Sequence, residues 1–242
     1  MSAIKLNIDI GNSNLKWRLH LLDGQLRSGV CAAADLYKID PFIGIADVQI
    51  NCINVCSVAS NEANDRLKQL LVKHWSLKAD FFKTTSQYAG VTNSYVDPDK
   101  MGADRWLASI AAVNLYPNQE ICVADCGTAI NIEFLSAKGV HLGGYILPGL
   151  NMMQQSLLSK TARIEQVLNK ASIEPGYDTS SNVSNGSYYI NLALLEKLQK
   201  QMQLNKGVLI ITGGGADFFE DKIQGSNIEF KKNLVLDGFD FI

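Results

Sequence analysis

One short motif, an aspartate followed by any residue, a glycine and a polar residue, occurs twice and ends a predicted strand each time. The copies are Asp9-Ile10-Gly11-Asn12 and Asp125-Cys126-Gly127-Thr128, which lie about half of the 242-residue chain apart. Alternating apolar residues and hairpin signals predict three short antiparallel strands around each copy. These strands are expected at residues 4–10, 15–22 and 25–30, and again at 120–125, 129–135 and 140–147. The sequence therefore predicts an α/β protein made of two repeats of one strand-strand-strand-helix unit.

The rest of the chain is consistent with such a repeat. Helices are predicted at residues 61–74, 103–115, 150–159 and 187–204, and further strands at 48–58, 77–82 and 208–212. The first helix is expected to be capped at Asn61-Glu62, and a polar loop is expected to run through Thr179. The repeats join near residues 116–120, and no segment is low in complexity. We divide the chain into an N-terminal half, residues 1–117, and a C-terminal half, residues 118–242.

Composition excludes several classes of protein. The formal net charge is −2 and charged residues make up 19% of the chain, which argues against a nucleic-acid partner or a polybasic membrane patch. No apolar stretch approaches the ~20 residues that a bilayer span needs, and the N-terminus lacks the apolar core of a signal peptide. We therefore expect a cytoplasmic protein that binds neither nucleic acid nor membrane.

The cysteine and histidine residues predict no disulfide and no metal site of their own. Two pairs of cysteines are spaced four apart within predicted strands, a separation of ~13 Å, whereas a disulfide joins α-carbons less than ~7 Å apart. Buried reduced thiols are therefore expected. The pairs are Cys52 with Cys56 and Cys122 with Cys126. The histidines, expected to be exposed or partly packed without a special role, are His20, His74 and His141.

The first motif has the residue types that a phosphate-binding turn needs. A carboxylate at a strand end can hold a divalent cation through water, and Gly11 would let the backbone approach a ligand. Asn12 and Ser13 add donors, and Lys16 adds a compensating charge. A hairpin whose polar side chains bond only the local backbone is the alternative. The second, similarly acidic copy favours phosphate binding. The turn is not a P-loop.

Two other segments allow both a functional and a structural interpretation, and a third allows only a structural one. Gly213-Gly214-Gly215 follows an apolar strand and could admit a nucleotide or simply turn the chain. Asp104 could be a base toward a hydroxyl or could complement a helix dipole, and Arg105 could bind a carboxylate or lie at the surface. Locally the structural interpretation is favoured at 104–105. The Gly143–Gly149 segment indicates structure alone.

Five blocks in order, covering nearly the whole chain, resemble type III pantothenate kinases, a family of the acetate kinase, sugar kinase, Hsp70 and actin superfamily. The blocks are Asp9 to Lys16; Asn93-x-Tyr95-x-x-Pro98-x-x-Met101-Gly102-x-Asp104-Arg105-Trp106; Asp125-x-Gly127-Thr128-Ala129; Gly143-Gly144-x-Ile146-x-Pro148-Gly149; and Gly176-x-x-Thr179. The resemblance implies a duplicated ribonuclease-H-like (actin-like ATPase) fold, with two similar halves around a nucleotide cleft.

The resemblance also implies an activity and its residues. The expected reaction is ATP-dependent phosphorylation of pantothenate, the first step toward coenzyme A, in a homodimer. Asp104 would be the general base, Mg²⁺ would accompany ATP near Asp9, and Asp125 would help bind a monovalent cation, K⁺ or NH₄⁺. ATP would be bound by Asp9, Ile10, Gly11, Asn12, Ser13, Asn14, Leu15, Lys16 and Thr128. Pantothenate would be bound by Tyr95, Gly102, Ala103, Asp104, Arg105 and Thr179.

The chain departs from the family pattern at a few positions. Glu133 stands where aspartate is common and could alter the spacing of a cation near Asp125. The other departures are Ser13, Met101, Asn131, Asn182 and Val183. Two alternative functions remain at this stage, namely another kinase of the same superfamily and a non-catalytic nucleotide-binding regulator.

Overall fold

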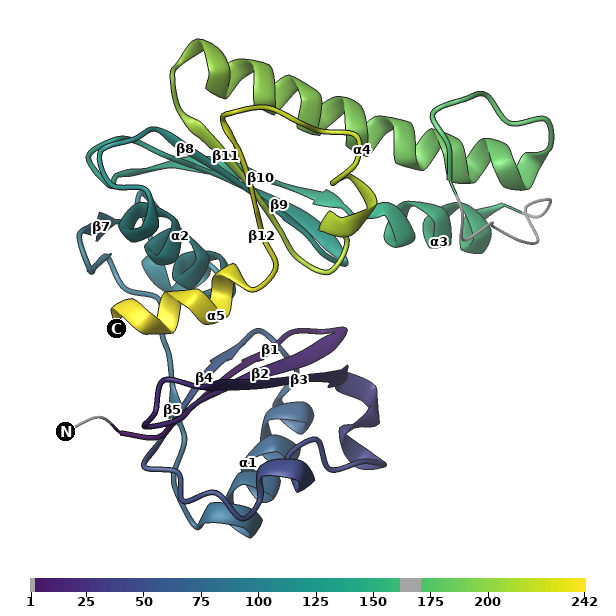
Figure 1. Ribbon diagram of the computed structural model, residues 1–242. Helices are drawn as coiled ribbons and strands as arrows, with labels where there is room; N and C mark the ends of the chain where they lie inside the picture. The colour runs from purple at the N-terminus through teal and green to yellow at the C-terminus, as the bar shows by residue number, and fades with distance from the viewer. Residues whose placement is uncertain (1–2, 162–170) are drawn as a thin grey trace. The chain divides into compact units, whose positions relative to one another are not determined.

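The chain forms two compact units (Figure 1). The computed structural model describes residues 3–161 and 171–242. Unit 1 comprises Met1–Asn114 together with Val235–Ile242, and unit 2 comprises Leu115–Leu234. The chain therefore passes from unit 1 to unit 2 after Asn114 and returns after Leu234, whereas the sequence suggested a single division at residue 117.

Each unit contains a five-stranded mixed sheet, and the two sheets have the same strand order. The orders are β3-β2-β1-β4-β5 in unit 1 and β10-β9-β8-β11-β12 in unit 2. In each sheet the first three strands are antiparallel and the last three run parallel. This confirms the duplicated α/β fold. The strands are β1 Lys5–Ile10, β2 Asn14–His20, β3 Leu26–Ala32, β4 Cys52–Ser57, β5 Asp80–Phe81, β8 Ile121–Cys126, β9 Ala129–Leu135, β10 His141–Pro148, β11 Val208–Thr212 and β12 Ile228–Lys231.

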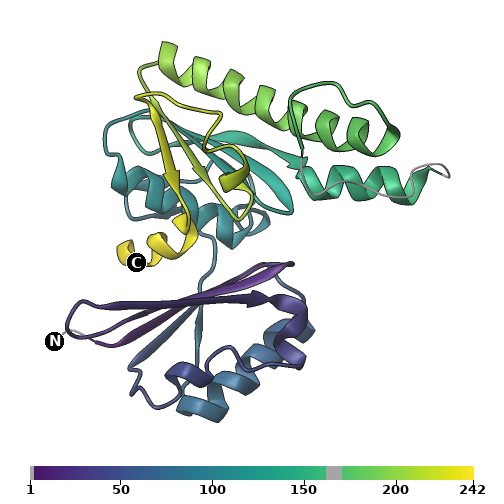
Figure 2. The same ribbon diagram turned by 45° about the vertical axis from the view of Figure 1, so that its right-hand side comes forward.

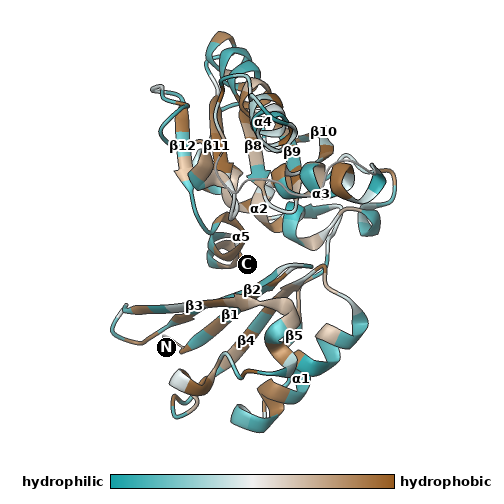
Figure 3. Cartoon of the chain, turned by 90° about the vertical axis from the view of Figure 1, so that its right-hand side faces the viewer, coloured by the Kyte–Doolittle hydropathy of each residue, from teal (hydrophilic) through white to brown (hydrophobic). Residues whose placement is uncertain are grey.

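The core of unit 1 lies between one face of its sheet and α1 (Asn61–Trp75). Leu6, Ile8 and Ile10 alternate along β1 and are fully buried in this core, so Asn7 and Asp9 lie on the opposite face. In Figure 3 the ribbon of α1 shows both apolar and polar residues, as expected of a helix with one buried face. The helix is capped by the hydroxyl of Ser60, which accepts a hydrogen bond from the Ala63 amide; the cap expected at Asn61-Glu62 was therefore wrong.

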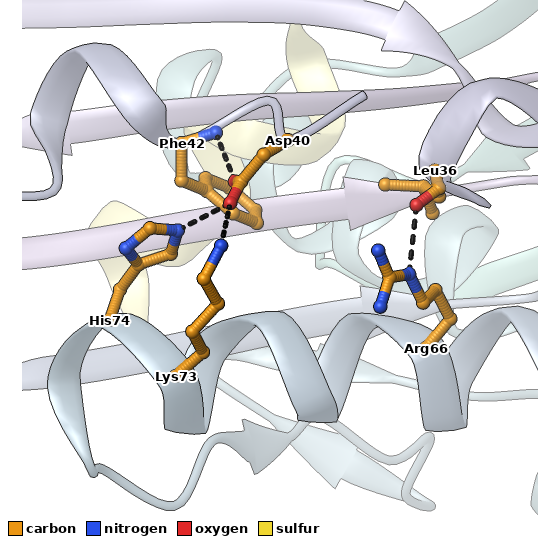
Figure 4. Close-up of polar contacts among 6 residues, drawn as sticks. All are labelled: Leu36, Asp40, Phe42, Arg66, Lys73 and His74. Carbon is orange, nitrogen blue, oxygen red and sulfur yellow. Dashed lines mark hydrogen bonds and ion pairs between the residues drawn. The ribbon is translucent and has the colours of Figure 1, made fainter. Parts of the chain in front are cut away.

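Side chains of α1 bind the segment between β3 and β4 at two places (Figure 4). Arg66 Nε donates to the Leu36 carbonyl oxygen at 2.9 Å, and His74 and Lys73 contact the carboxylate of Asp40. Asp40 Oδ2 lies 2.7 Å from His74 Nε2 and 3.1 Å from Lys73 Nζ. Its Oδ1 accepts a hydrogen bond from the Phe42 amide. The short 3₁₀ helices of this segment are η1 Ala33–Tyr37 and η2 Ile43–Ile45.

Unit 1 also contains the elements around residue 100 and the C-terminal segment. A small hairpin, β6 (Gln87–Tyr88) and β7 (Val91–Thr92), precedes η3 (Pro98–Lys100) and α2 (Ala103–Leu115). The last eight residues hold most of α5 (Leu234–Gly238) and all of η5 (Phe239–Phe241).

In unit 2, α3 (Leu150–Lys160) and α4 (Thr179–Leu204) lie side by side (Figures 1 and 2). Here α4 begins at Thr179 instead of the predicted Ser187, because Asp178 accepts a hydrogen bond from the Ser181 amide in a capping box. Part of the predicted loop before it lies outside the described residues. A short 3₁₀ helix, η4 (Ala216–Phe218), follows β11.

All five cysteines are described and none forms a disulfide, as expected. Cys56, Cys122 and Cys126 are buried, but Cys31 and Cys52 are only partly buried, so the expectation of a buried thiol was wrong for these two. Within residues 3–161 and 171–242, no helix is long and apolar enough to cross a membrane.

Candidate functional site

The first motif forms a turn between β1 and β2. Asp9, at the end of β1, pairs in register with Lys16 on β2, and both side chains are partly buried. The Gly11 amide donates to the Asn14 carbonyl oxygen at 2.9 Å. A Cβ added to Gly11 would meet no atom closer than that oxygen, 3.9 Å away, so the protein's own packing does not require glycine there. The turn leaves room for a ligand to approach its backbone.

The remaining residues of this turn divide into exposed and buried groups. Asn12, Ser13 and Asn14 are exposed. Ile10 and Leu15 are fully buried in the core, so only their main-chain atoms could contact a nucleotide.

Cys56 on β4 links this turn to the start of α2. It pairs in register with Asp9. Burial raises the pKa of the Cys56 thiol well above its ordinary value, and the charges of Asp9 and Asp104 raise it further. The start of α2 also adjoins this strand, because a Cβ at Gly102 would lie 3.6 Å from Cγ1 of Val58, the residue just after β4. The fold of unit 1 therefore places the first motif and the predicted base at the same end of β4.

Local contacts fix Asp104 in the first turn of α2. Its Oδ1 accepts a hydrogen bond from the Arg105 amide at 2.8 Å. A Cβ at Gly102 would lie 2.6 Å from the same oxygen, so glycine at 102 accommodates the aspartate side chain. The Thr84 hydroxyl donates to the Met101 carbonyl oxygen at 2.8 Å, which holds the chain just before the helix.

Arg105 is held by Tyr95 and is only 9% exposed. Its Nη1 donates to Tyr95 Oη at 2.9 Å, and its guanidinium carbon lies 5.6 Å from the centre of the tyrosine ring. The Tyr95 amide in turn donates to Asn93 Oδ1. The alternative of a surface arginine is thus wrong. A buried guanidinium with fixed orientation is suited to binding a carboxylate.

In unit 2, two glycine-containing segments are hydrogen-bonded to the second motif, residues 125–128. The Gly215 amide donates to the Cys126 carbonyl oxygen at 2.7 Å, and the Gly149 amide donates to the Thr128 carbonyl oxygen at 3.0 Å. Gly213 has φ +90°, and a Cβ there would collide with Asp125 Oδ1 and the Cys126 carbonyl. Burial, followed by the charge of Asp125, raises the pKa of Cys126 to about 12. The triple glycine therefore lies against the Asp125 turn.

Glu133 and His141 form a buried pair that the sequence did not predict. His141 Nε2 lies 2.8 Å from Glu133 Oε2, and the side chains are 0% and 2% exposed. The expectation that His141 is exposed or partly packed was wrong. Glu133 pairs in register with Val123, while Asn131 faces Asp125. A Cβ at Gly144 would collide with Glu133 Oε2 and the Ile132 carbonyl, which explains one of the paired glycines.

Thr179 lies in a groove between α3 and α4. This groove has a volume of about 740 Å³ and is lined largely by apolar side chains. Pro148, also in its wall, directly precedes the Gly149 that bonds Thr128. The lining residues used below are Met152, Leu157, Thr179, Asn182 and Ile190.

The described residues contain no group of three or more His, Cys, Asp or Glu side chains that could hold a metal ion. A cation at Asp9 or Asp125 would therefore take its remaining ligands from backbone, phosphate or water oxygens.

Duplicated mixed sheets with an acidic glycine turn after each first strand define the actin-like ATPase and sugar kinase fold. A solved Sinorhizobium meliloti structure, named as a candidate 2-dehydro-3-deoxygalactonokinase, shares this fold with a TM-score of 0.56, at 12% identity over 98% of this chain and 97% of that one. A Campylobacter jejuni structure, named as a candidate Baf family transcriptional activator, has a TM-score of 0.53 at 19% identity, over 97% of this chain and 95% of that one.

Sequence comparison gives the family. The model of the type III pantothenate kinase family matches residues 5–201. Two curated type III pantothenate kinases are similar over nearly their whole length. The kinase from Marinobacter nauticus is 34% identical, and the match covers 98% of this chain and 97% of that protein. The kinase from Hahella chejuensis is 33% identical, and the match covers 97% of this chain and 94% of that protein. The chain belongs to the type III pantothenate kinase family.

Proposed function

We propose that this kinase transfers the γ-phosphoryl group of ATP to the primary hydroxyl of pantothenate, giving 4′-phosphopantothenate and ADP as the first step toward coenzyme A. Family membership supports this reaction. The observation that carries the proposal is that both the first motif and the start of α2 adjoin β4: Asp9 pairs in register with Cys56, and a Cβ at Gly102 would lie 3.6 Å from Val58 Cγ1, just after that strand. This places a phosphate turn and a carboxylate that can accept a proton at the same end of one strand.

The proposed mechanism relies on positioning and charge stabilisation. The pantothenate hydroxyl oxygen attacks the γ-phosphorus, the bond from that phosphorus to the β–γ bridging oxygen breaks, and Asp104 takes the hydroxyl proton. Lys16 and the amides of the turn at 9–16 stabilise negative charge on the phosphoryl oxygens. Thr128, in the turn of unit 2, contacts ATP.

Arg105 and Tyr95 are proposed to bind the carboxylate of pantothenate. A guanidinium presents its N–H donors in a planar fork that matches two carboxylate oxygens, and Tyr95 holds that fork in place. Gly102 and Ala103 line the same end of α2, and Thr179 contributes from the start of α4.

The residues present fit the expected cations. Carboxylate and carbonyl oxygens are the ligands that hard cations prefer. Asp9 offers a carboxylate for Mg²⁺, and Asp125 with the neighbouring Cys126 carbonyl offers two oxygens for K⁺ or NH₄⁺. When bound with ATP, Mg²⁺ neutralises phosphate charge.

We also propose that the enzyme is a homodimer. Large apolar side chains are exposed along α3 and α4, including Met152 at 42%, Leu157 at 40% and Ile190 at 58%. Exposed apolar side chains that gather on one face mark an interaction surface, and we propose that a second copy of the chain covers this one.

A coupled ADP-release assay with ATP, Mg²⁺ and pantothenate tests the proposal, run once with potassium and once with sodium alone. Pantothenate-dependent turnover that needs potassium is the expected result. Turnover that is the same with and without potassium would support the kinase activity and contradict the role of Asp125 in binding a monovalent cation. Parallel reactions with glycerol, hexoses and acetate test for another kinase of the superfamily. No turnover with ATP binding intact would favour the regulator.

A further inference from the structure

The last residues of the chain contact unit 1 at two elements of its candidate site. Residues Val235–Ile242 belong to unit 1, although the strand before them, β12, belongs to unit 2. Figure 1 draws α5 beside α2. Neighbouring residues of this C-terminal segment contact β2 and α2.

The first contact is an ion pair with β2. Arg18 Nη1 lies 2.7 Å from Asp237 Oδ1, and the two side chains are 13% and 24% exposed. Arg18 is two residues from Lys16 on the same strand, so both side chains project from the same face of the sheet. The register places Lys16 opposite Asp9. The ion pair therefore anchors the segment beside the strands that carry the first motif.

The second contact is with α2. A Cβ at Gly238 would lie 2.5 Å from both the carbonyl oxygen and Cγ of Leu107. The φ of Gly238 is −59°, so close packing, not backbone conformation, requires glycine. Leu107 is three residues after Asp104, which places it one helical turn away. Next in the chain, the ring of Phe239 packs edge-on against Phe82, with centroids 6.5 Å apart.

We infer that the C-terminal segment, residues 235–242, sets the position of Asp104 relative to the turn at 9–16. Asp237 and Gly238 are positioning residues for the reaction proposed above, and the inference rests on that proposed function. Asp237 fixes the segment to β2, and Gly238 sets how closely α2 packs against it. A displacement of ~1 Å between reacting groups can lower a rate ~10²-fold, so a small shift of α2 changes turnover more than it changes substrate binding.

Two variants disturb these contacts in different ways. Asp237→Asn removes the charge and keeps the size, while Gly238→Ala keeps the ion pair and pushes against Leu107. For each we expect kcat to fall about tenfold, with both KM values changing less than about threefold. Hydrogen–deuterium exchange of the amides at 103–107 should become faster. Asp237→Glu, which keeps the carboxylate, should recover most of kcat.

Asp217→Asn is the matched control. It removes the Lys232–Asp217 ion pair of unit 2, which spans 3.3 Å with side chains 72% and 63% exposed, and should leave kcat and exchange at 103–107 unchanged. Wild-type kcat in both test variants, or unchanged exchange at 103–107 in Asp237→Asn, would overturn the inference. If the wild-type protein does not phosphorylate pantothenate, the proposed function fails, and the exchange comparison still decides whether the segment holds α2.

Discussion

Asp104 lies in the first turn of α2, where the helix dipole and the Arg105 amide favour a negative charge on its carboxylate. Asp104→Asn keeps the shape and the acceptor oxygen but removes the proton acceptor. We expect turnover to fall ~10²-fold or more, with pantothenate binding by calorimetry preserved. Asp99→Asn, at an exposed aspartate of η3, is the control and should keep full turnover. An Asp104→Asn enzyme with more than about a tenth of the wild-type rate would contradict the base assignment.

Arg105 is expected to affect substrate binding more than chemistry. Arg105→Lys keeps a positive charge but loses the planar fork and its hydrogen bond to Tyr95. The KM for pantothenate should rise about tenfold or more, because the loss of a charge-assisted hydrogen bond is worth about 1.5–3 kcal/mol. The KM for ATP should stay within about twofold. Steady-state kinetics with each substrate varied separately measure both, and an unchanged pantothenate KM would rule out this role.

Individual residues also show which parts of the candidate site could be predicted from the sequence and which could not. Asp9, Asp104, Asp125 and Arg105 could be selected because acidic and basic residues stood beside glycines. The proximity of Asp9 and Asp104 could be inferred only through the family resemblance, since it depends on how α2 meets β4. The Glu133–His141 pair escaped notice because neither residue belongs to a motif, and a β-bulge between His141 and Gly143 changes the register there.

At the scale of elements, most strands and helices follow from periodicity, and the exceptions have physical causes. The first turns of α4 contain Ser, Asn and Gly, which are weak helix formers. The capping box at Asp178 and the burial of Val183 and Ser184 outweigh that weakness. The spacing of Asp178 and Ser181, which is that of a capping box, was the sequence signal that could have predicted the start of this helix. The four-residue β12 was missed because its side chains are all only partly buried, so it shows no clear alternation.

The Asp40 cluster of Figure 4 predicts a pH-dependent contribution to stability. Burial pushes the pKa of Asp40 upward, but hydrogen bonds from His74, Lys73 and the Phe42 amide outweigh it and hold that pKa below its ordinary value. A carboxyl with a lowered folded-state pKa stabilises the protein above its unfolded pKa, ~3.9. That stability is lost as the pH falls through the lower folded-state value.

Asp40→Asn should therefore lower the free energy of unfolding by about 1 kcal/mol at pH 6, a modest figure because the cluster is partly solvated. The difference from wild type should shrink progressively below about pH 4. Urea unfolding at pH 6 and pH 3 measures it. Asp65→Asn removes an exposed ion pair with Lys68 on the same helix and should have little effect at either pH. An Asp40→Asn deficit that is equal at both pH values would exclude the ionised carboxylate as its source.

At the scale of the whole molecule, the repeated motif together with the repeated order of predicted strands and turns around it predicted two related sheets. The identical strand orders agree with that prediction. The return of residues 235–242 to unit 1 was not predictable, since its contacts, Arg18 with Asp237 and Leu107 with Gly238, join residues far apart in sequence.

The proposed homodimer depends on the apolar face of α3 and α4. Ile190 lines the groove of α4 and is 58% exposed. A twofold interface presents the same residue from both protomers, so Ile190→Asp would bury two unpaired carboxylates, each at a cost of several kcal/mol. The dimer dissociation constant should rise more than about a hundredfold. Leu204→Asp is the control, because Leu204 is 85% exposed near the C-terminal end of α4 and does not line the groove.

Sedimentation velocity over a range of protein concentrations measures the association, and activity over the same range links it to function. Thr179 and Asn182 line the groove that contains Ile190, so an interface there would also shape the wall beside the proposed pantothenate-binding Thr179. We therefore expect the specific activity of Ile190→Asp to fall on dilution at concentrations where wild type and Leu204→Asp keep theirs. A wild-type protein that sediments as a monomer at tens of micromolar, or an Ile190→Asp variant that stays dimeric, would place the groove outside any interface between copies, and its apolar side chains would then need another ligand.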